Sequence, residues 1–157
     1  MRQNVTFPIG AIALLEKADA QTGFFKAVFD GIGGRAKDFI PAVKLLMANK
    51  LEESVAIHRI LDFTPKEKLS MLGFKKGVSD RTLNRTLERL GKNRQFVLDK
   101  YQQWVKANNL NDKIQNVDFS SSYFEGDNCG LAKLGYSRDH QPGKPQLVFA
   151  WSVPIAV

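Results

Sequence analysis

Apolar residues recur three and four positions apart along much of the first half of the chain. The segments 22–30, 36–51 and 53–61 show this spacing, which aligns apolar side chains along one side of a helix. A Gly-Ile-Gly-Gly-Arg run follows the first segment. It lacks the Gly-Lys-Ser/Thr ending of a phosphate-binding loop and does not follow a strand pattern. We therefore expect short helices in this half, with the glycines ending the first of them.

Two further helices are predicted in the middle of the chain. Thr-Pro-Lys-Glu at 64–67 is the pattern of a capping box with proline at the first helical position, and Gly73 should end that helix. Ser79 is expected to cap a second helix, which covers residues 80–90 and ends at Gly91.

The second of these helices has two unlike faces. Leu83, Leu87 and Leu90 recur on one side, and cations occupy the other. A helix-turn-helix, here at about residues 64–91, needs a recognition helix divided in this way. The connection between the two helices is longer than the usual turn of about three or four residues. In a DNA-binding role, the contacting residues would be Arg81, Asn84, Arg85, Arg89 and Lys92.

The distribution of charge supports a role in binding a polyanion. The net charge is +7, and the segment 64–110 alone carries 11 basic and 4 acidic residues, so the remainder of the chain is neutral overall. A basic excess confined to one segment is expected where a protein meets double-stranded DNA. The alternative is a solvated basic helix surface without a partner.

Strand patterns are confined to the last third of the chain. Residues 94–107 form one more helix candidate, with Trp104 expected in the core rather than as a platform for base stacking. The segments 114–124 and 146–153 are then rich in β-branched and aromatic residues. A loop with several glycines, prolines and cations joins these two predicted strands.

The composition narrows the class of protein. No stretch approaches the roughly 18 to 20 continuous apolar residues that a membrane-spanning helix needs. Phe7–Leu15 is apolar, but Glu16 and Lys17 follow it and disfavour a secretory signal. A single cysteine, Cys129, permits neither an internal disulfide nor a multi-cysteine zinc site, and neither histidine stands at the spacing of a catalytic partner. We expect a cytoplasmic protein with no membrane partner.

Asp118 is the candidate for metal chemistry. It lies in the first predicted strand, before a long connection and a second strand, an arrangement that suits an enzyme holding Mg²⁺ at the edge of a sheet. A two-metal site needs several converging carboxylates, so one aspartate is insufficient. Glu125 lies beyond the strand on the opposite face by alternation, and Asp139 is further away. On the residues alone, a turn or surface aspartate is favoured over a small independent metal nuclease.

The residues around Asp118 resemble a known family. VDFSSSYFEG, followed by GLAKLGYSRDHQPGKPQLVF, resembles the first-strand region of insertion-sequence transposases with an RNase H-like DDE catalytic domain. Upstream, SDRTLNRTLERLG resembles the helix that precedes this domain in the same proteins. The similarity covers roughly residues 61–151, and residues 1–63 are only loosely similar.

The resemblance implies roles for particular residues. Asp118 would be the first acid of the DDE triad, which coordinates two divalent cations such as Mg²⁺ for strand cleavage and transfer. The loop beside the active edge would contact DNA through Lys133, Tyr136, Arg138 and Lys144.

The same resemblance sets expectations for the whole chain. Such transposases continue beyond the position of Val157 to a second Asp and a Glu, so we expect a truncated or frameshifted form that binds DNA and is inactive in cleavage alone. The alternative is a regulator that competes with intact transposase for the element ends. Expected partners are the duplex terminal repeats and a second copy or intact transposase, in the cytoplasm at the nucleoid. The predicted organisation is α+β, with a helical, helix-turn-helix-like DNA-binding region at 1–110 and the first strands of an incomplete RNase H-like domain at 111–157.

Overall fold

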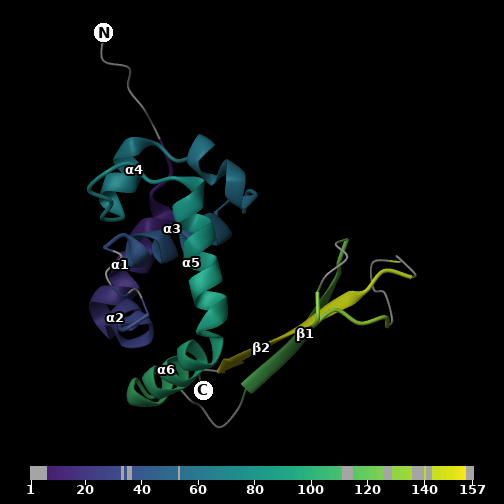
Figure 1. The fold of residues 1–157 in the computed structure, drawn as a ribbon. Helices are drawn as coiled ribbons and strands as arrows, with labels where there is room; N and C mark the ends of the chain where they lie inside the picture. Colours follow the sequence, from purple (N-terminus) through teal and green to yellow (C-terminus); the bar gives the residue numbers. More distant parts are fainter. Residues whose placement is uncertain are drawn as a thin grey trace. The chain divides into compact units, whose positions relative to one another are not determined.

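The chain forms two compact units. The computed structural model describes residues 7–32, 34, 37–52, 54–110, 115–125, 129–135, 140 and 143–154. The first unit is Met1–Asn108, called the helical unit below, and the second is Asn109–Val157, called the hairpin unit. At this coarse level the structure confirms the predicted α+β class, because it is mainly helical with one small antiparallel sheet (Figure 1). None of the described helices is long and apolar enough to cross a membrane.

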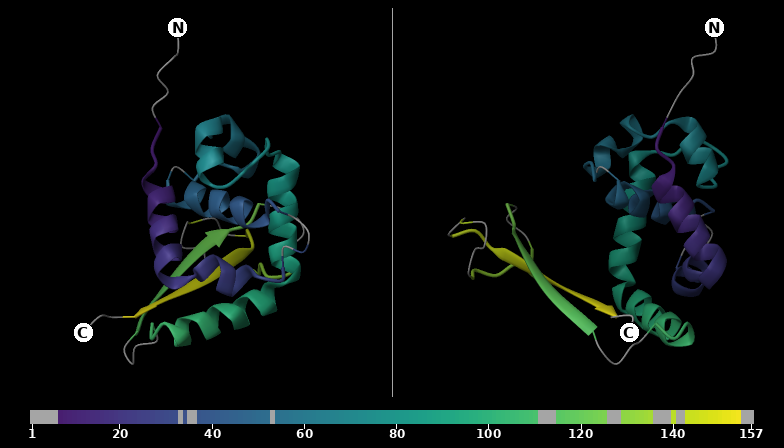
Figure 2. Two further views of the ribbon diagram at one scale, coloured as in Figure 1. Left: turned by 90° about the vertical axis from the view of Figure 1, so that its left-hand side faces the viewer. Right: turned by 180° about the vertical axis from the view of Figure 1, so that it is seen from behind.

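The described part of the helical unit is built from short helices. In chain order they are α1 (Gly10–Thr22), α2 (Phe24–Phe29), α3 (Phe39–Leu51), the 3-10 helix η1 (Ile57–Asp62), α4 (Lys66–Met71), α5 (Asp80–Lys92) and α6 (Arg94–Ala107). α3 lies between α1 and α5 and packs against both, as both views of this unit show (Figures 1 and 2). α5 also packs against η1, and α6 packs against α2.

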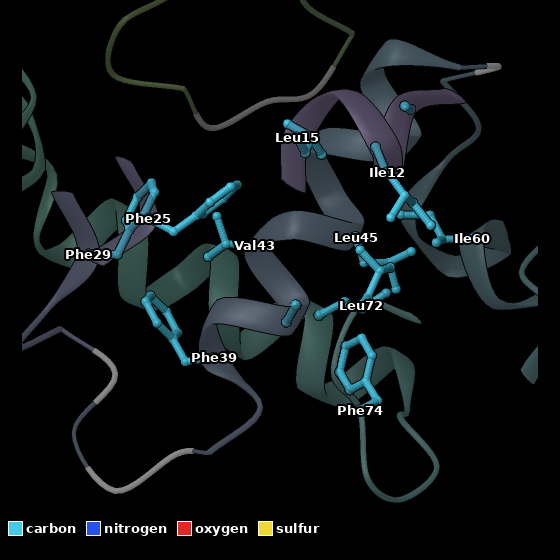
Figure 3. Close-up of a cluster of buried hydrophobic side chains, with 14 of the residues drawn as sticks. Ile12, Leu15, Phe25, Phe29, Phe39, Val43, Leu45, Ile60, Leu72 and Phe74 are labelled. Atoms are coloured by element: carbon cyan, nitrogen blue, oxygen red, sulfur yellow. The ribbon is translucent and has the colours of Figure 1, made fainter. Parts of the chain in front are cut away.

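The core of the helical unit forms around α3. Its sequence, FIPAVKLLMANKL, is apolar on most sides, as expected of a helix that packs against several neighbours. Ile12 of α1, Leu45 of α3 and Ile60 of η1 lie close together, each at most 2% exposed (Figure 3). Each such side chain contributes about 1.5–3 kcal/mol by leaving water. The buried apolar side chains among the described residues all lie between Ala11 and Leu83, so this core belongs to the helical unit.

Two largely buried lysines tie the helices of this core together. Lys44 of α3 pairs with Glu16 of α1 at 2.7 Å. Lys68 of α4 is 4% exposed and pairs with Glu52, the residue after α3, at 2.5 Å. A charge at this depth is tolerated only with a partner, so removing Glu52 would be costly, whereas Lys44 has a second carboxylate, Asp19, at 3.5 Å.

Several predicted helix boundaries are wrong for local reasons. The capping box at 64–67 does not form, because the Thr64 hydroxyl donates to the Ile60 carbonyl at 2.6 Å instead of capping α4. Ser79 does precede α5, but its hydroxyl lies 3.2 Å from that of Thr82 and caps no backbone N–H. Gly91 does not end α5, which continues for one more residue before Asn93 separates it from α6.

The predicted helix at 53–61 is replaced by the shorter 3-10 helix η1. The side chain of Asn49 both accepts from the Val55 N–H at 3.2 Å and donates to the Val55 carbonyl at 3.0 Å. Ser54, just before, has a φ of 49°. These interactions hold the chain in a turn after α3 and prevent helical geometry until Ile57.

The hairpin unit contains β1 (Gln115–Tyr123) and β2 (Gln146–Pro154), which pair antiparallel. Both strands were predicted, to within one residue at each end. The Phe124 N–H donates to the Pro145 carbonyl at 2.8 Å, and Lys133 forms a two-bond bridge with Gln146 that extends the ladder into the connection. Of the hairpin side chains that the structure describes, only Gln146 is buried.

Candidate nucleic-acid interface

One side of α5 fixes this helix to the core. Leu83 is fully buried, Leu90 packs partly against the core, and the Thr86 hydroxyl donates to the Thr82 carbonyl at 2.9 Å. Leu87, predicted on the packed side, is 36% exposed and lines an open apolar groove of about 740 Å³ with residues of α3 and η1. The packed side of α5 therefore includes fewer leucines than their spacing in the sequence predicted.

The other side of α5 faces solvent and carries the predicted cations. Arg81, Arg85 and Lys92 are exposed. Arg89 is half-buried, with its guanidinium 5.8 Å from the centre of the Phe39 ring. Asn84 is exposed and uses one amide hydrogen to bond the Asp80 carbonyl at 3.0 Å. The structure thus brings all five predicted residues together on one exposed surface, called the α5 face below.

A carboxylate lies within the α5 face. Glu88 accepts a hydrogen bond from Lys92 at 2.6 Å, one helical turn away. That hydrogen bond, followed by the Lys92 charge and the more distant charge of Arg85, lowers the pKa of Glu88 below its ordinary value. Lys92 is therefore paired in the free protein, and a phosphate would have to compete with Glu88 for it.

A concave pocket borders the α5 face where α5 meets the start of α3. Its volume is about 200 Å³. The lining residues come from two segments far apart in the sequence, namely Lys37, Asp38 and Phe39 from one and Thr82, Arg85, Thr86 and Arg89 from the other. Lys37 and Thr82 were not predicted as site residues, because no periodicity or charge run connects segments that meet only in the folded chain.

The second predicted contact region lies in the hairpin unit. Lys144 pairs with Glu125 at 2.9 Å and lies 4.6 Å from the centre of the Tyr123 ring. The hydrogen bond to Glu125 raises the pKa of Lys144. Lys133 is exposed beside the bridge to Gln146. The other two predicted loop residues, Tyr136 and Arg138, lie outside the described residues.

Asp118 occupies the middle of β1, opposite Trp151 in β2. The structure describes its backbone position but not its side chain. Alternation along the strand puts Ser120 on the same face, whereas the Glu125 carboxylate is occupied by Lys144. Within the described ranges, no three His, Cys, Asp or Glu side chains converge as metal ligands.

Comparisons of the chain with known protein families, with curated proteins and with solved structures found no match. The α5 face and the sequence motifs around Asp118 are therefore the features that indicate a function.

Proposed function

We propose that the helical unit binds double-stranded DNA through the α5 face, and that the chain is related to the insertion-sequence transposases its sequence resembles. The observation that carries the first statement is the position of Arg81, Arg85, Arg89 and Lys92 on the side of α5 opposite the fully buried Leu83. Packing of Leu83 in the core fixes the orientation of α5, so the cationic side chains of this helix lie together on its opposite side.

The dimensions of α5 suit a DNA groove. Its 13 residues span about 20 Å, and the major groove is about 12 Å wide, which admits one α-helix. Arginine presents a planar fork of donors that fits both phosphate oxygens and the edge of guanine. In this proposal α5 is the recognition helix of a helix-turn-helix-like unit, with α4 before it and α3 and η1 holding it in place.

The proposal assigns binding, and not cleavage, to these residues. Asp118 would stand at the position of a first DDE acid, and the loop with Lys133, Tyr136, Arg138 and Lys144 would lie near DNA. Cleavage by Mg²⁺ would require further acids at the same site. The proposal therefore extends to cleavage only where further carboxylates converge with Asp118.

Salt dependence of duplex binding tests the α5 face. The purified chain is titrated against a labelled duplex of about 20 base pairs, two helical turns, at several salt concentrations. We expect log K to fall with log salt at a slope of about −3 to −5, because each contacted phosphate contributes about −0.9. Arg81→Ala should reduce the affinity and bring the slope closer to zero by about 1.

Lys17→Ala is the matched control, because Lys17 is an exposed cation on α1, on the far side of α3 from α5. Its affinity and salt slope should equal those of the unchanged chain. Equal losses in both variants would show that binding follows net charge and not the α5 face. Absence of any duplex binding at low salt would refute the proposed function itself.

A further inference from the structure

The pocket between α5 and the start of α3 has the composition of an anion site. Among the described residues, three cationic side chains line it, Lys37, Arg85 and Arg89, against one acidic residue, Asp38. The three cations come from two segments, so their convergence is a property of the fold and not of one basic helix. A pocket with this balance of charge favours an anion over water or a cation.

Other interactions engage part of the pocket lining. The Arg89 guanidinium lies 5.8 Å from the centre of the Phe39 ring, within the range of a cation–π contact. Thr86 is 4% exposed and its hydroxyl is committed to the Thr82 carbonyl, so it forms a fixed wall. Thr82 is half-buried, and its hydroxyl can rotate to donate into the pocket while accepting from Ser79, 3.2 Å away.

The described lining of this pocket includes only part of the α5 face. Thr82, Arg85 and Arg89 stand three and four residues apart and form one stripe. Arg81 and Asn84 precede Arg85 by four and one residues and lie outside the pocket lining. Two kinds of contact can therefore be made by one helix, one within the pocket and one outside it.

We propose that this pocket binds a single backbone phosphate of the DNA duplex and sets the register of α5, an inference that rests on the proposed function. Phosphate contacts position a protein on DNA, whereas base contacts specify the sequence. A phosphate held by Lys37, Thr82 and the two arginines would leave Arg81 and Asn84 to reach base edges. The arginine fork and the hydroxyl are donors that match a tetrahedral phosphate group.

The test uses the full chain and two variants that remove pocket donors outside the predicted cation set. Lys37→Ala removes an exposed charge before α3, and Thr82→Val removes one hydroxyl with little change of shape. We expect each to weaken binding about three- to tenfold, equally for all duplex sequences. Only Lys37→Ala should also reduce the salt slope, by about 1. Lys17→Ala is again the matched control and should bind as the unchanged chain does.

A duplex scan then identifies the phosphate. Methylphosphonate replacement removes the charge of one backbone phosphate at a time. At one position, this replacement should lower the duplex affinity of the unchanged chain but not that of Lys37→Ala. Inorganic phosphate in place of chloride, at equal ionic strength, should compete with the backbone phosphate for the same donors. We expect it to displace DNA from the unchanged chain more than from Lys37→Ala. Equal displacement from both chains would show that no DNA phosphate occupies the pocket and would overturn the proposal.

The two proposals fail in different ways. If the unchanged chain binds duplex DNA and both pocket variants bind equally well, the pocket inference is wrong and the α5 face stands. If the unchanged chain binds no duplex, both are wrong. Circular dichroism of Lys37→Ala and Thr82→Val should show the helical content of the unchanged chain, so that a lost contact is separated from a lost fold.

Discussion

Glu88 places a negative charge within the otherwise cationic α5 face. Its carboxylate holds Lys92 at 2.6 Å, and this hydrogen bond lowers the pKa of Glu88 below the ordinary value of 4.5. A lowered folded-state pKa means that the pair is complete above the ordinary value and is lost as the pH falls through the lowered one. At neutral pH, Lys92 is therefore shared between Glu88 and any approaching phosphate.

Glu88→Gln should strengthen duplex binding by about two- to fivefold and make the salt slope steeper by up to about 1, because it removes a repulsive charge and releases Lys92. The measurement is the same duplex titration. Glu67→Gln is the control, since Glu67 is an exposed acid on α4 outside the α5 face. Unchanged affinity in Glu88→Gln would show that Lys92 does not reach DNA.

The pKa of Glu88 can be followed separately by NMR titration of its side chain. The midpoint should lie below 4.5 in the unchanged chain and rise toward 4.5 in Lys92→Met, which removes the first cause of the shift while keeping an unbranched side chain. A midpoint that is the same in both chains would exclude the ion pair in solution.

At the level of single residues, the sequence predicted which side chains carry charge and which helix bears them. It could not predict their partners. The pairing of Lys144 with Glu125 joins positions on either side of the long connection between the strands, and the pocket joins Lys37 to α5. Partners of this kind depend on tertiary packing, and the spacing of residues in the sequence does not indicate them.

At the scale of the helix, α5 is held by fewer leucines than its pattern predicts. Leu83→Ala should lower the free energy of unfolding by about 2–4 kcal/mol, because it opens a cavity at a fully buried site. Leu87→Ala on the same helix should cost clearly less, since Leu87 is 36% exposed. Urea unfolding followed by circular dichroism measures both, and similar losses would contradict the packing of α5 described here.

Element boundaries were predictable where local rules agreed with the packing. α6 and both strands have the predicted type and nearly the predicted ends. The apolar spacing in α6 and the β-branched and aromatic composition of the strands were sufficient for these predictions. The capping box failed where Thr64 had a competing carbonyl acceptor in Ile60, and the helix at 53–61 failed where Asn49 holds Val55. In each case the local structure depends on a hydrogen bond that the spacing of residues in the sequence does not indicate.

At the scale of the whole molecule, the two units differ in how much they bury. The helical unit contains the described apolar core, so under the proposed function it would bind DNA without the hairpin, as a competing regulator would require. The described apolar side chains of the hairpin are largely exposed, with Phe119 at 62% and Val148 at 68%. β2 is nonetheless apolar at successive positions from Leu147 to Ala150, a pattern typical of strands covered on both faces.

Hydrogen exchange of the full chain should show this difference directly. Amides of α3 should be the most protected, with opening free energies near that of global unfolding, whereas amides of β1 and β2 should exchange much faster. Mass spectrometry of peptides from the two units provides the comparison. Equal protection in both units would mean that something covers the hairpin strands in solution.

The largely buried ion pair of Lys68 and Glu52 in the helical unit is only weakly screened by salt. It closes a ring of chain that contains η1, one of the elements against which α5 packs. Screening weakens exposed charges far more than buried ones. Under the proposed function, the ions that release duplex DNA from the α5 face would leave this pair intact, so the helical unit would dissociate from DNA as a folded body and rebind without a folding step.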